Sequence, residues 1–357
     1  MRLPQVVTVA QLDLFDEVID VRSPSEYAED HVPGAINCPV LDDAERAEVG
    51  TLYKQVSPFA ARKRGAALVA RNIARHVEQV FSERPQDWRP LVYCWRGGKR
   101  SGAMAHVLRE IGWQSAQLDG GYKSYRRHVV SQLEILPAEY EFIVICGETG
   151  SAKSRLLAAL ARRGAATLDL EQIACHRGSV LGGLPESPQP SQKGFETQVW
   201  DALRRLPTDQ PIFVEAESKK IGELQVPEHL LQRMRASRCI RLEASVAERV
   251  RFLTEEYRHF LDDPAPLHEK LGHLAALHGK ETIARWRDFA RTGQWERLVA
   301  DLLESHYDPA YRRSSARNFV HFTEAPAIVL ASLAPDALDA AAARIVREAS
   351  VASAAAA

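Results

Sequence analysis

Short apolar runs alternate with amphipathic stretches along the first third of the chain. Apolar runs predict strands at residues 17–21 and 91–94, and helical periodicity predicts helices at residues 25–29, 66–80 and 101–111. Strand and helix in alternation are typical of a parallel α/β sheet.

The pattern breaks at Pro137 and then starts again. The second series consists of predicted strands at residues 141–146, 166–170 and 211–216, with a helix at residues 154–163. We therefore place a domain boundary near Pro137. A second α/β domain is expected to follow it.

Beyond Pro227 the pattern is mostly helical, most clearly at residues 243–260, 267–292 and 296–305. The alanine-rich residues 349–357 are expected to fray. The expected organisation is a first domain at residues 1–136 and a second at 137–335, whose helical extension starts at about 227. A C-terminal helix and tail at 336–357 complete it.

Composition excludes several classes of protein. The 357 residues are 45% hydrophobic and 26% charged, which is too apolar for a disordered chain. A net charge of -1 means that any nucleic-acid surface must be a local patch. The five cysteines contain no C-x-x-C pair, so neither a disulfide framework nor a structural zinc site is expected. No secretory signal or membrane span is recognisable, so we expect a cytoplasmic protein that has no membrane partner.

Cys94 ends a predicted strand and precedes a glycine pair and a helix. In such a loop, backbone N–H groups converge on one point and the helix N-terminus adds positive potential there. We expect Cys94 to be a thiolate nucleophile whose pKa neighbouring cations lower. The proposed loop consists of Cys94, Arg96, Gly97, Gly98, Lys99 and Arg100. The alternative is a strand cysteine that is simply buried.

A second loop, residues 147–154 (GETGSAKS), follows a predicted strand and opens a helix, as a Walker A loop does. Its N–H groups and Lys153 would hold two phosphates, and Ser154 would reach Mg²⁺. The expected phosphate-binding residues are Gly147, Thr149, Gly150, Ser151, Lys153 and Ser154. Ala152 replaces the usual glycine and could crowd the loop. A degenerate loop with only a structural role is the alternative.

Polar residues follow the neighbouring predicted strands, where the ligand crevice of a parallel sheet lies. These residues are Asp169, Glu171, His176, Arg177, Glu215 and Glu217. We expect them to complete the site of the second domain. Glu215 and Glu217 could instead face solvent together, because they are two residues apart on one strand.

Four motifs make the first third similar to the rhodanese superfamily. They are residues 20–27 (DVRSPSEY), 31–37 (HVPGAIN), the Cys94 loop and 118–122 (LDGGY). The loop has the form C-x5-R, which resembles phosphatases of that superfamily and suggests a phosphorus-bearing donor. Asp20 and Arg22 are interpreted as an internal ion pair that supports the fold.

A rhodanese domain followed by a P-loop domain resembles the bacterial tRNA 2-selenouridine synthases over nearly the whole chain. The matching segments are residues 93–98, 100–101, 120–123, 169–171, 176–179, 194–196, 214–218, 221–222 and 306–311. Ala152 is the clear departure from the family pattern.

The resemblance implies an enzyme that acts on wobble 2-thiouridine, position 34 in the anticodon of the tRNAs for Lys, Glu and Gln. Geranyl diphosphate would alkylate the sulfur, and selenophosphate would then supply selenium, which Cys94 would carry as a selenopersulfide. The phosphate loop would then hold the diphosphate and need no ATP. Selenophosphate synthetase is a further candidate partner.

Two cationic regions are candidates for contact with tRNA phosphates. Arg64, Arg71 and Arg75 line one face of the predicted helix at 66–80, and the C-terminal region contains Arg287, Arg291, Arg312 and Arg313. Aromatic residues interleave with the second group and could stack on bases, although most such rings pack inward.

Two other functions remain open. One is an ATP-assisted tRNA sulfurtransferase that relays sulfur through Cys94. The other is a regulatory module without catalysis, in which an inactive rhodanese domain is joined to a nucleotide-sensing P-loop domain.

Overall fold

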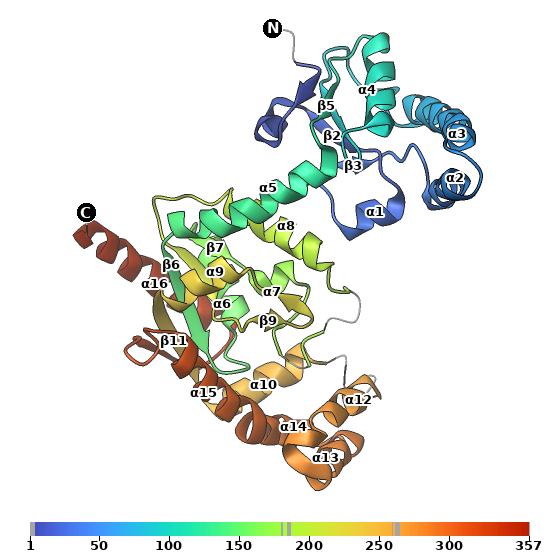
Figure 1. Cartoon of the computed structure of the whole chain (residues 1–357). Helices are drawn as coiled ribbons and strands as arrows, with labels where there is room; N and C mark the ends of the chain where they lie inside the picture. The colour runs from blue at the N-terminus through green and yellow to red at the C-terminus, as the bar shows by residue number, and fades with distance from the viewer. Residues whose placement is uncertain (1–3, 180, 184–186, 259, 261–264, 357) are drawn as a thin grey trace. The chain divides into compact units, whose positions relative to one another are not determined.

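The computed structural model describes residues 4–179, 181–183, 187–258, 260 and 265–356 (Figure 1). The chain divides into two compact units. Unit 1 comprises residues 1–132 and 190–201, and unit 2 comprises residues 133–189 and 202–357. A segment from the middle of the chain therefore belongs to the N-terminal unit.

Unit 1 contains a five-stranded parallel sheet in the order β1-β5-β4-β2-β3. The strands are β1 (Val6–Val7), β2 (Glu17–Asp20), β3 (Ile36–Asn37), β4 (Pro90–Tyr93) and β5 (Ala116–Leu118). Helices α1 (Pro24–Glu29), α2 (Asp43–Gln55), α3 (Pro58–Gln79), α4 (Lys99–Ile111) and α5 (Gly121–Ile135) join them, with a 3-10 turn, η1, at Val9–Leu14. The central strand β4 is buried along its whole length, so its carboxyl end presents Cys94 from a rigid position.

Apolar residues of the sheet and helices form the core of unit 1. Ile19 and Val92 from β2 and β4 pack with Met104 and Leu108 from one face of α4. Because the two helical residues are four apart, they lie on one side of the helix. This packing fixes α4, whose first turn follows the Cys94 loop.

Unit 2 contains a second five-stranded parallel sheet, in the order β12-β11-β6-β8-β7. The strands are β6 (Phe142–Gly147), β7 (Ala166–Leu168), β8 (Ile212–Glu215), β11 (Arg238–Ala244) and β12 (Ala327–Leu330), and β9 (Lys220–Ile221) and β10 (Leu224–Gln225) form a separate hairpin. Parallel pairing brings the carboxyl ends of β6, β7 and β8 to one edge. The predicted parallel α/β fold is confirmed in both units.

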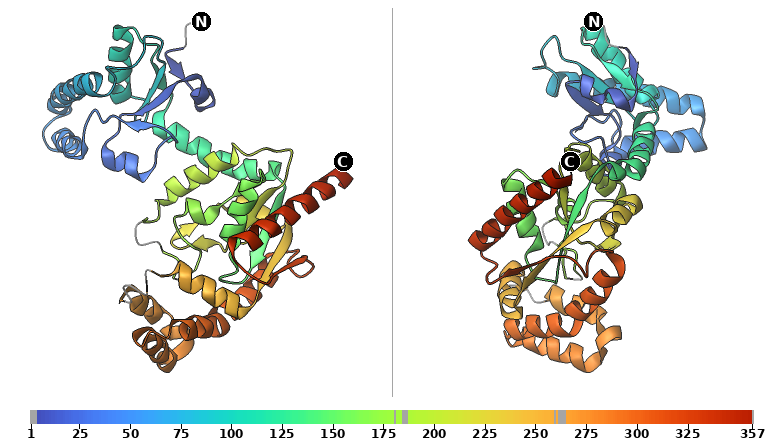
Figure 2. Two further views of the ribbon diagram at one scale, coloured as in Figure 1. Left: turned by 180° about the vertical axis from the view of Figure 1, so that it is seen from behind. Right: turned by 90° about the vertical axis from the view of Figure 1, so that its left-hand side faces the viewer.

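Helices surround and extend this second sheet. Those nearest the sheet are η2 (Leu136–Glu139), α6 (Lys153–Arg162), α7 (Leu170–Ile173), α9 (Glu228–Arg235), α10 (Val246–Glu256) and α16 (Pro335–Ala356), and α8 (Gln192–Leu203) begins in unit 1. The helical extension contains α12 (Ala265–His273), α13 (Ala275–Arg291), α14 (Trp295–Leu302), a π-helical turn η3 (Leu303–Tyr307) and α15 (Asp308–Asn318). Within unit 2, α10 leads from the sheet to this extension (Figure 2).

Three expectations for the C-terminal half were wrong. Residues 243 and 244 end strand β11 instead of opening a helix, and β12 was not predicted. The expected helix at 267–292 is interrupted between α12 and α13, and Gly279 has a non-helical backbone within α13. Parallel pairing of β11 with β6 and β12 stabilises β11 and β12, whose local sequence pattern is ambiguous.

Two predicted elements differ at their ends from the expectation or extend beyond the described residues. The backbone of α16 is helical to Ala356 despite the expected fraying, because alanine is the best helix former. Residue 259 of the predicted helix at 243–260, and Ala357, lie outside the described residues.

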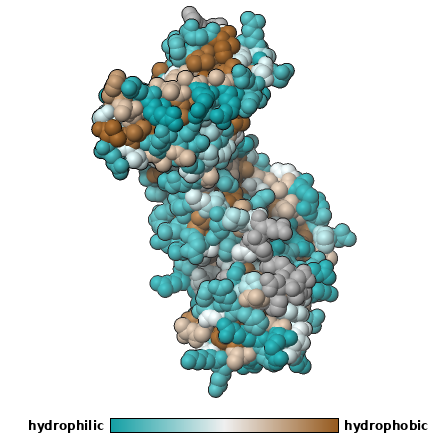
Figure 3. All heavy atoms as spheres, turned by 90° about the vertical axis from the view of Figure 1, so that its right-hand side faces the viewer, coloured by the Kyte–Doolittle hydropathy of each residue, from teal (hydrophilic) through white to brown (hydrophobic). Residues whose placement is uncertain are grey.

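In the face shown in Figure 3, hydrophilic side chains predominate and apolar ones form small groups. Among the described residues, no helix is long and apolar enough to cross a membrane.

Candidate functional site

Cys94 lies at the carboxyl end of β4, facing the first turn of α4. Its Sγ accepts hydrogen bonds from Ser101 Oγ at 3.1 Å and from the backbone N–H of Gly98 at 3.3 Å. The residue is 3% exposed. Burial raises the pKa of the Cys94 thiol, but hydrogen bonds from Ser101 and from the N–H groups of Ser101, Arg96 and Gly98 more than offset it. The net pKa is below the ordinary value, so this cysteine is activated.

The neighbours of the thiol are fixed by the strand next to β4. Gln117 on β5 donates hydrogen bonds to Ser101 Oγ at 2.8 Å and to the carbonyl oxygen of Gly97 at 2.5 Å. Gly121 has a positive φ, and a Cβ there would lie 2.1 Å from the Cys94 carbonyl oxygen, so only glycine fits. Sequence reasoning did not assign Ser101 or Gln117 to the site. Ser101 could have been found, because it follows the C-x5-R pattern directly.

The cationic side chains of the loop do not have the role that we expected. Hydrogen-bond donors, rather than Arg96, Lys99 or Arg100, lower the pKa of Cys94. Arg100 forms an ion pair with Glu26 at 3.1 Å, which offsets its charge. Arg96 and Lys99 are exposed. Long side chains extend away from a tight loop, whereas its backbone N–H groups must point into it.

Two further cations flank the loop and were missed in the sequence. Lys123 and Arg127 are exposed on α5, four residues apart and hence on one face. The backbone N–H of Lys123 donates to the carbonyl oxygen of Trp95 at 3.0 Å, which ties α5 to the Cys94 loop. Among the described residues, neither these two cations nor Arg96 and Lys99 form an ion pair.

The structural role expected for Asp20 and Arg22 is confirmed. Both are buried, and an Arg22 Nη lies 2.6 Å from an Asp20 carboxylate oxygen. The same guanidinium donates to the carbonyl oxygen of Asp30 and lies over the Tyr122 ring. The pair thereby connects β2 to the segment that carries the second motif.

The phosphate loop, residues 147–154, joins β6 to α6. Lys153 Nζ donates to the carbonyl oxygen of Gly147 at 2.9 Å, so the lysine folds back over its own loop. The buried Ser151 hydroxyl has no hydrogen-bond partner among the described residues. Both observations fit a loop whose donors are arranged for an anion.

Ala152 adopts the left-handed backbone conformation that glycine would favour, with φ 61° and ψ 35°. Its methyl group is 5% exposed and belongs to the apolar cluster of α6 and the sheet. The side chain therefore packs into the core, and the cost of the alanine is backbone strain of ~1–2 kcal/mol.

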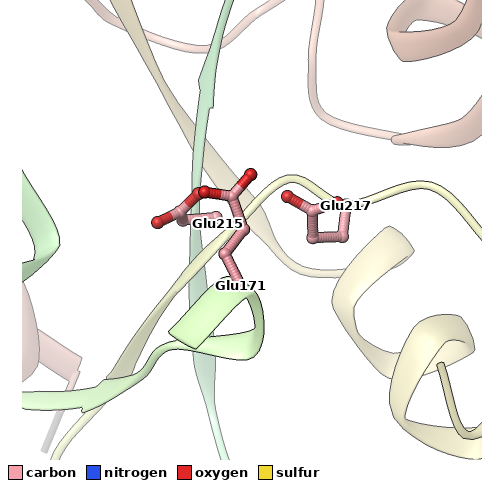
Figure 4. Close-up of side chains that lie close together, drawn as sticks. All are labelled: Glu171, Glu215 and Glu217. Atoms are coloured by element: carbon pink, nitrogen blue, oxygen red, sulfur yellow. The ribbon is translucent and has the colours of Figure 1, made fainter. Parts of the chain in front are cut away.

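Three glutamates gather close together (Figure 4), and they line the same cavity as Lys153 and Ser154. Glu171, Glu215 and Glu217 each offer a carboxylate oxygen, and these oxygens lie within 4.8 Å of one another. Ser154 Oγ donates to Glu171 at 2.9 Å. Glu215 and Glu217 are both buried, so the alternative of two solvent-facing carboxylates is wrong.

The charge state of this cluster depends on what it binds. Both carboxylate oxygens of Glu215 are buried without a hydrogen-bond partner among the described residues. Burial, followed by the nearby Glu171 charge, raises the pKa of Glu215 well above its ordinary value and that of Glu217 to about 8. A buried carboxylate without donors requires a proton or a cation. The cluster can therefore hold a divalent cation through oxygen ligands.

The remaining predicted residues lie around the same cavity. Asp169 caps α7 by accepting from the Gln172 N–H at 2.8 Å, and burial raises its pKa. His176 Nδ1 accepts from the Gly178 N–H at 3.1 Å, and burial lowers the pKa of this histidine. Arg177 pairs with Glu256 at 3.3 Å.

These groups line one cavity of about 500 Å³ in unit 2. Of the predicted residues, the lining includes Thr149, Gly150, Lys153, Ser154, Asp169, Glu171, His176, Arg177, Glu215 and Glu217. Tyr311, which sequence reasoning did not place here, accepts from the Gly147 N–H at 2.6 Å. Arg249 was missed as well: it pairs with Asp308 at 2.8 Å and donates to the Thr149 carbonyl oxygen, which supports the loop from behind.

Most of the arginines expected to contact tRNA have protein partners. Arg64 and Arg71 pair with Glu48 and Glu45 of α2, and Arg75 donates to Asn72. Arg287 donates to a carbonyl oxygen, while Arg291 and Arg312 pair with Asp288 and Glu148. Arg313 is exposed and forms no ion pair among the described residues. The aromatic side chains nearby, led by the fully buried Trp286, pack in the core of the helical extension.

Comparison with known proteins matches two domain families to successive parts of the chain. A rhodanese-like domain matches residues 8–128, and a tRNA 2-selenouridine synthase AAA domain matches residues 140–277. A tRNA 2-selenouridine synthase from Nitrosomonas europaea is 37% identical over 67% of this chain. The chain spans 63% of that relative's length, which is less than two thirds. A second, from Cupriavidus pinatubonensis, is 36% identical over 75% of this chain and 72% of its own length.

Among solved structures, a rhodanese-related protein from Thermoplasma volcanium is 17% identical and aligns with 35% of this chain and 93% of its own, with a TM-score of 0.23.

Proposed function

Because this chain belongs to the tRNA 2-selenouridine synthase family, we propose that it converts 2-thiouridine to 2-selenouridine at the wobble position of the tRNAs for Lys, Glu and Gln. The observation that carries the proposal is the activated Cys94, held by hydrogen-bond donors in a C-x5-R loop. A chain with a purely regulatory role would have no need of a thiol held in this way.

The first proposed step is alkylation of the tRNA sulfur by geranyl diphosphate. The sulfur forms a bond to C1 of the geranyl group, the C1–O bond breaks, and diphosphate leaves with the electron pair while the base loses its N3 proton. Lys153 and the N–H groups of the phosphate loop would stabilise the charge that develops on diphosphate. No bond of ATP needs to be broken in this step.

The phosphate loop also fits a magnesium ion. Glu215 is a buried carboxylate without donors, Glu171 and Glu217 lie beside it, and Ser154 donates to Glu171. Ser154, Glu171 and Glu215 would hold the ion, which when bound offsets the charge of the diphosphate.

The second proposed step exchanges the alkylated sulfur for selenium. Alkylation makes the sulfur a better leaving group, since it departs as geranylthiol. Selenophosphate is the proposed donor, and the anion-binding Cys94 loop is the proposed site for it. The Cys94 thiolate would form a bond to phosphorus while the Se–P bond breaks and selenium leaves as selenide. Selenide would then form a bond to C2 of the base, the C2–S bond would break and geranylthiol would leave, and water would release phosphate from Cys94. A selenopersulfide on Cys94 would need an oxidant as well, because selenophosphate carries selenium at the selenide level.

The test is a two-stage reaction with the purified full chain, followed by mass spectrometry of the tRNA nucleosides. Thiouridine-containing tRNA and geranyl diphosphate, without ATP, should give S-geranyl-2-thiouridine, and added selenophosphate should then give 2-selenouridine. Cys94→Ala should block the second stage and preserve the first, whereas Lys153→Ala should impair the first at least tenfold.

Matched controls are Cys38→Ala, a buried cysteine of the same unit, and Lys63→Ala, an exposed lysine on α3. Equal loss of both stages in Cys94→Ala would refute this division of labour. Sulfur incorporation that depends on ATP would instead support a sulfurtransferase. If neither reaction occurs, the remaining alternative is the regulatory module without catalysis.

A further inference from the structure

Unit 2 contains a second, narrow pocket that opens beside the phosphate-loop cavity. Five residues line both spaces: Thr149, Ser179, Leu253, Tyr257 and Tyr307. The second pocket continues from them into the helical extension, between α10, α12 and α14. Figure 1 shows α10 leading from the sheet toward α14 within this unit.

The walls of this second pocket are almost wholly apolar beyond the shared residues. Leu267 of α12, Leu298 and Leu302 of α14, and Phe260 line it, and each is at least nine-tenths buried. Two polar side-chain groups belong to the described lining beyond the junction. The Thr254 hydroxyl donates to the Val250 carbonyl oxygen at 2.9 Å, and Trp295 of α14 carries an indole N–H. Polarity therefore falls from the phosphate loop toward the helices.

This gradient discriminates between the two kinds of phosphate compound that a P-loop could bind. A nucleotide base carries ring nitrogens and exocyclic groups that need hydrogen-bond partners when buried. Among the described side chains of α12 and α14 that line the pocket, none offers a hydrogen-bond acceptor to such a base, and the indole N–H of Trp295 is the one donor. An isoprenoid chain has no such groups, and its affinity comes from the apolar surface that it buries.

We propose that this pocket holds the isoprenoid chain of a prenyl diphosphate whose diphosphate lies on the phosphate loop. Leu298, which lines this pocket but not the phosphate-loop cavity, limits the chain length in this proposal. The inference rests on the proposed function, in that it takes a prenyl diphosphate as the alkylating substrate. It adds the location of the chain and a role for the helical extension, neither of which follows from the alkylation itself.

The arrangement also places the reacting carbon. A chain in the apolar pocket and a diphosphate on the loop put C1 at the junction, near Ser179 and Tyr257, whose hydroxyl oxygens lie 3.2 Å apart. There the thiocarbonyl sulfur forms its bond to C1, the C1–O bond breaks, and diphosphate leaves with the electron pair. The N3 proton of the base passes to water.

Calorimetric titration of the full chain tests the pocket without a tRNA reaction. Geranyl diphosphate should bind at least 30-fold more tightly than inorganic diphosphate, because only the former has a chain to bury. Leu298→Trp, which fills the pocket, should reduce this difference to less than threefold while affinity for inorganic diphosphate is unchanged. Leu277→Trp is the control, since Leu277 is 73% exposed on α13.

A second variant keeps the test valid if the tryptophan disturbs folding. Leu298→Ala enlarges the pocket and should shift preference from geranyl toward farnesyl diphosphate by at least tenfold. Equal affinity of the wild-type chain for geranyl and inorganic diphosphate would overturn the inference, and so would an unchanged preference in both Leu298 variants. ATP binding that Leu298→Trp abolishes would also overturn it, by showing a nucleotide pocket.

The proposed function fails by a different result. Geranyl diphosphate could bind with the expected dependence on Leu298 while S-geranyl-2-thiouridine never forms. That result would support the prenyl pocket and refute the alkylation of tRNA.

Discussion

At Cys94 the groups that activate the thiol are neutral donors rather than charged side chains. Ser101 Oγ lies 3.1 Å from the sulfur, and Gln117 holds Ser101 in place. A hydrogen bond to a charged acceptor contributes ~1.5–3 kcal/mol, and each pKa unit corresponds to about 1.4 kcal/mol. One hydroxyl can therefore determine how much thiolate is present at neutral pH.

Ser101→Ala should raise the pKa of Cys94, because the thiolate loses its side-chain donor while burial remains. The rate of iodoacetamide alkylation as a function of pH measures this, since only the thiolate reacts. The midpoint should move to higher pH and the rate at pH 7 should fall. Ser131→Ala on the exposed face of α5 is the control, and a midpoint unaltered by Ser101→Ala would contradict the assignment.

The junction of the phosphate loop and α6 shows how an element tolerates an unfavourable residue. The left-handed backbone of Ala152 is strained, but its methyl group packs in the core and the loop keeps its turn. Gly150 differs, since it has a φ of +81° and a Cβ there would lie 2.7 Å from Leu253. Two positions of one loop thus differ in which residue they accept.

We expect Ala152→Gly to change the free energy of unfolding by less than about 1 kcal/mol, because relief of strain is opposed by chain entropy and the lost methyl contact. Gly150→Ala should destabilise by more than about 2 kcal/mol, since it adds both strain and a clash with Leu253. Urea unfolding of the two variants checks the comparison. An equal change in the free energy of unfolding in Ala152→Gly and Gly150→Ala would contradict the different tolerance expected at these two positions.

Across the whole molecule, the net charge of -1 hides how the cations are used. Arg64 and Arg71 are neutralised by glutamates of α2, while Lys123 and Arg127 beside the Cys94 loop form no ion pair among the described residues. Unpaired cations are the ones available to tRNA phosphates.

The double variant Lys123→Ala/Arg127→Ala should weaken tRNA binding about tenfold or more. It should also make the slope of log affinity against log salt concentration shallower by about 1 to 2, because fewer counterions leave the tRNA when fewer phosphate contacts form. Filter-binding titrations at salt concentrations from about 50 to about 200 mM measure the affinity and the slope. Arg64→Ala/Arg71→Ala is the matched control, because those side chains are engaged. A larger loss in the control would place the tRNA on α3 instead.

Sequence patterns predicted the two parallel sheets, the positions of both loops and the residue types at their mouths. These features are local: apolar runs form buried strands, and a glycine-rich turn before a helix exposes N–H groups. The same patterns missed β11 and β12: paired residues of these two strands are 86 apart along the chain, and those of β11 and β6 are 95 apart.

Only the tertiary structure decided which groups act on one another. Gln117 reaches Ser101 from a neighbouring strand, Glu171 and Glu215 meet because two strands end at one edge, and α10, α12 and α14 enclose the apolar pocket. It also showed that Arg64, Arg71 and Arg100 are engaged by glutamates. Periodicity gives a residue its face on a helix or strand, but long-range packing determines what that face meets, and hence the charge, burial and pKa on which the chemistry depends.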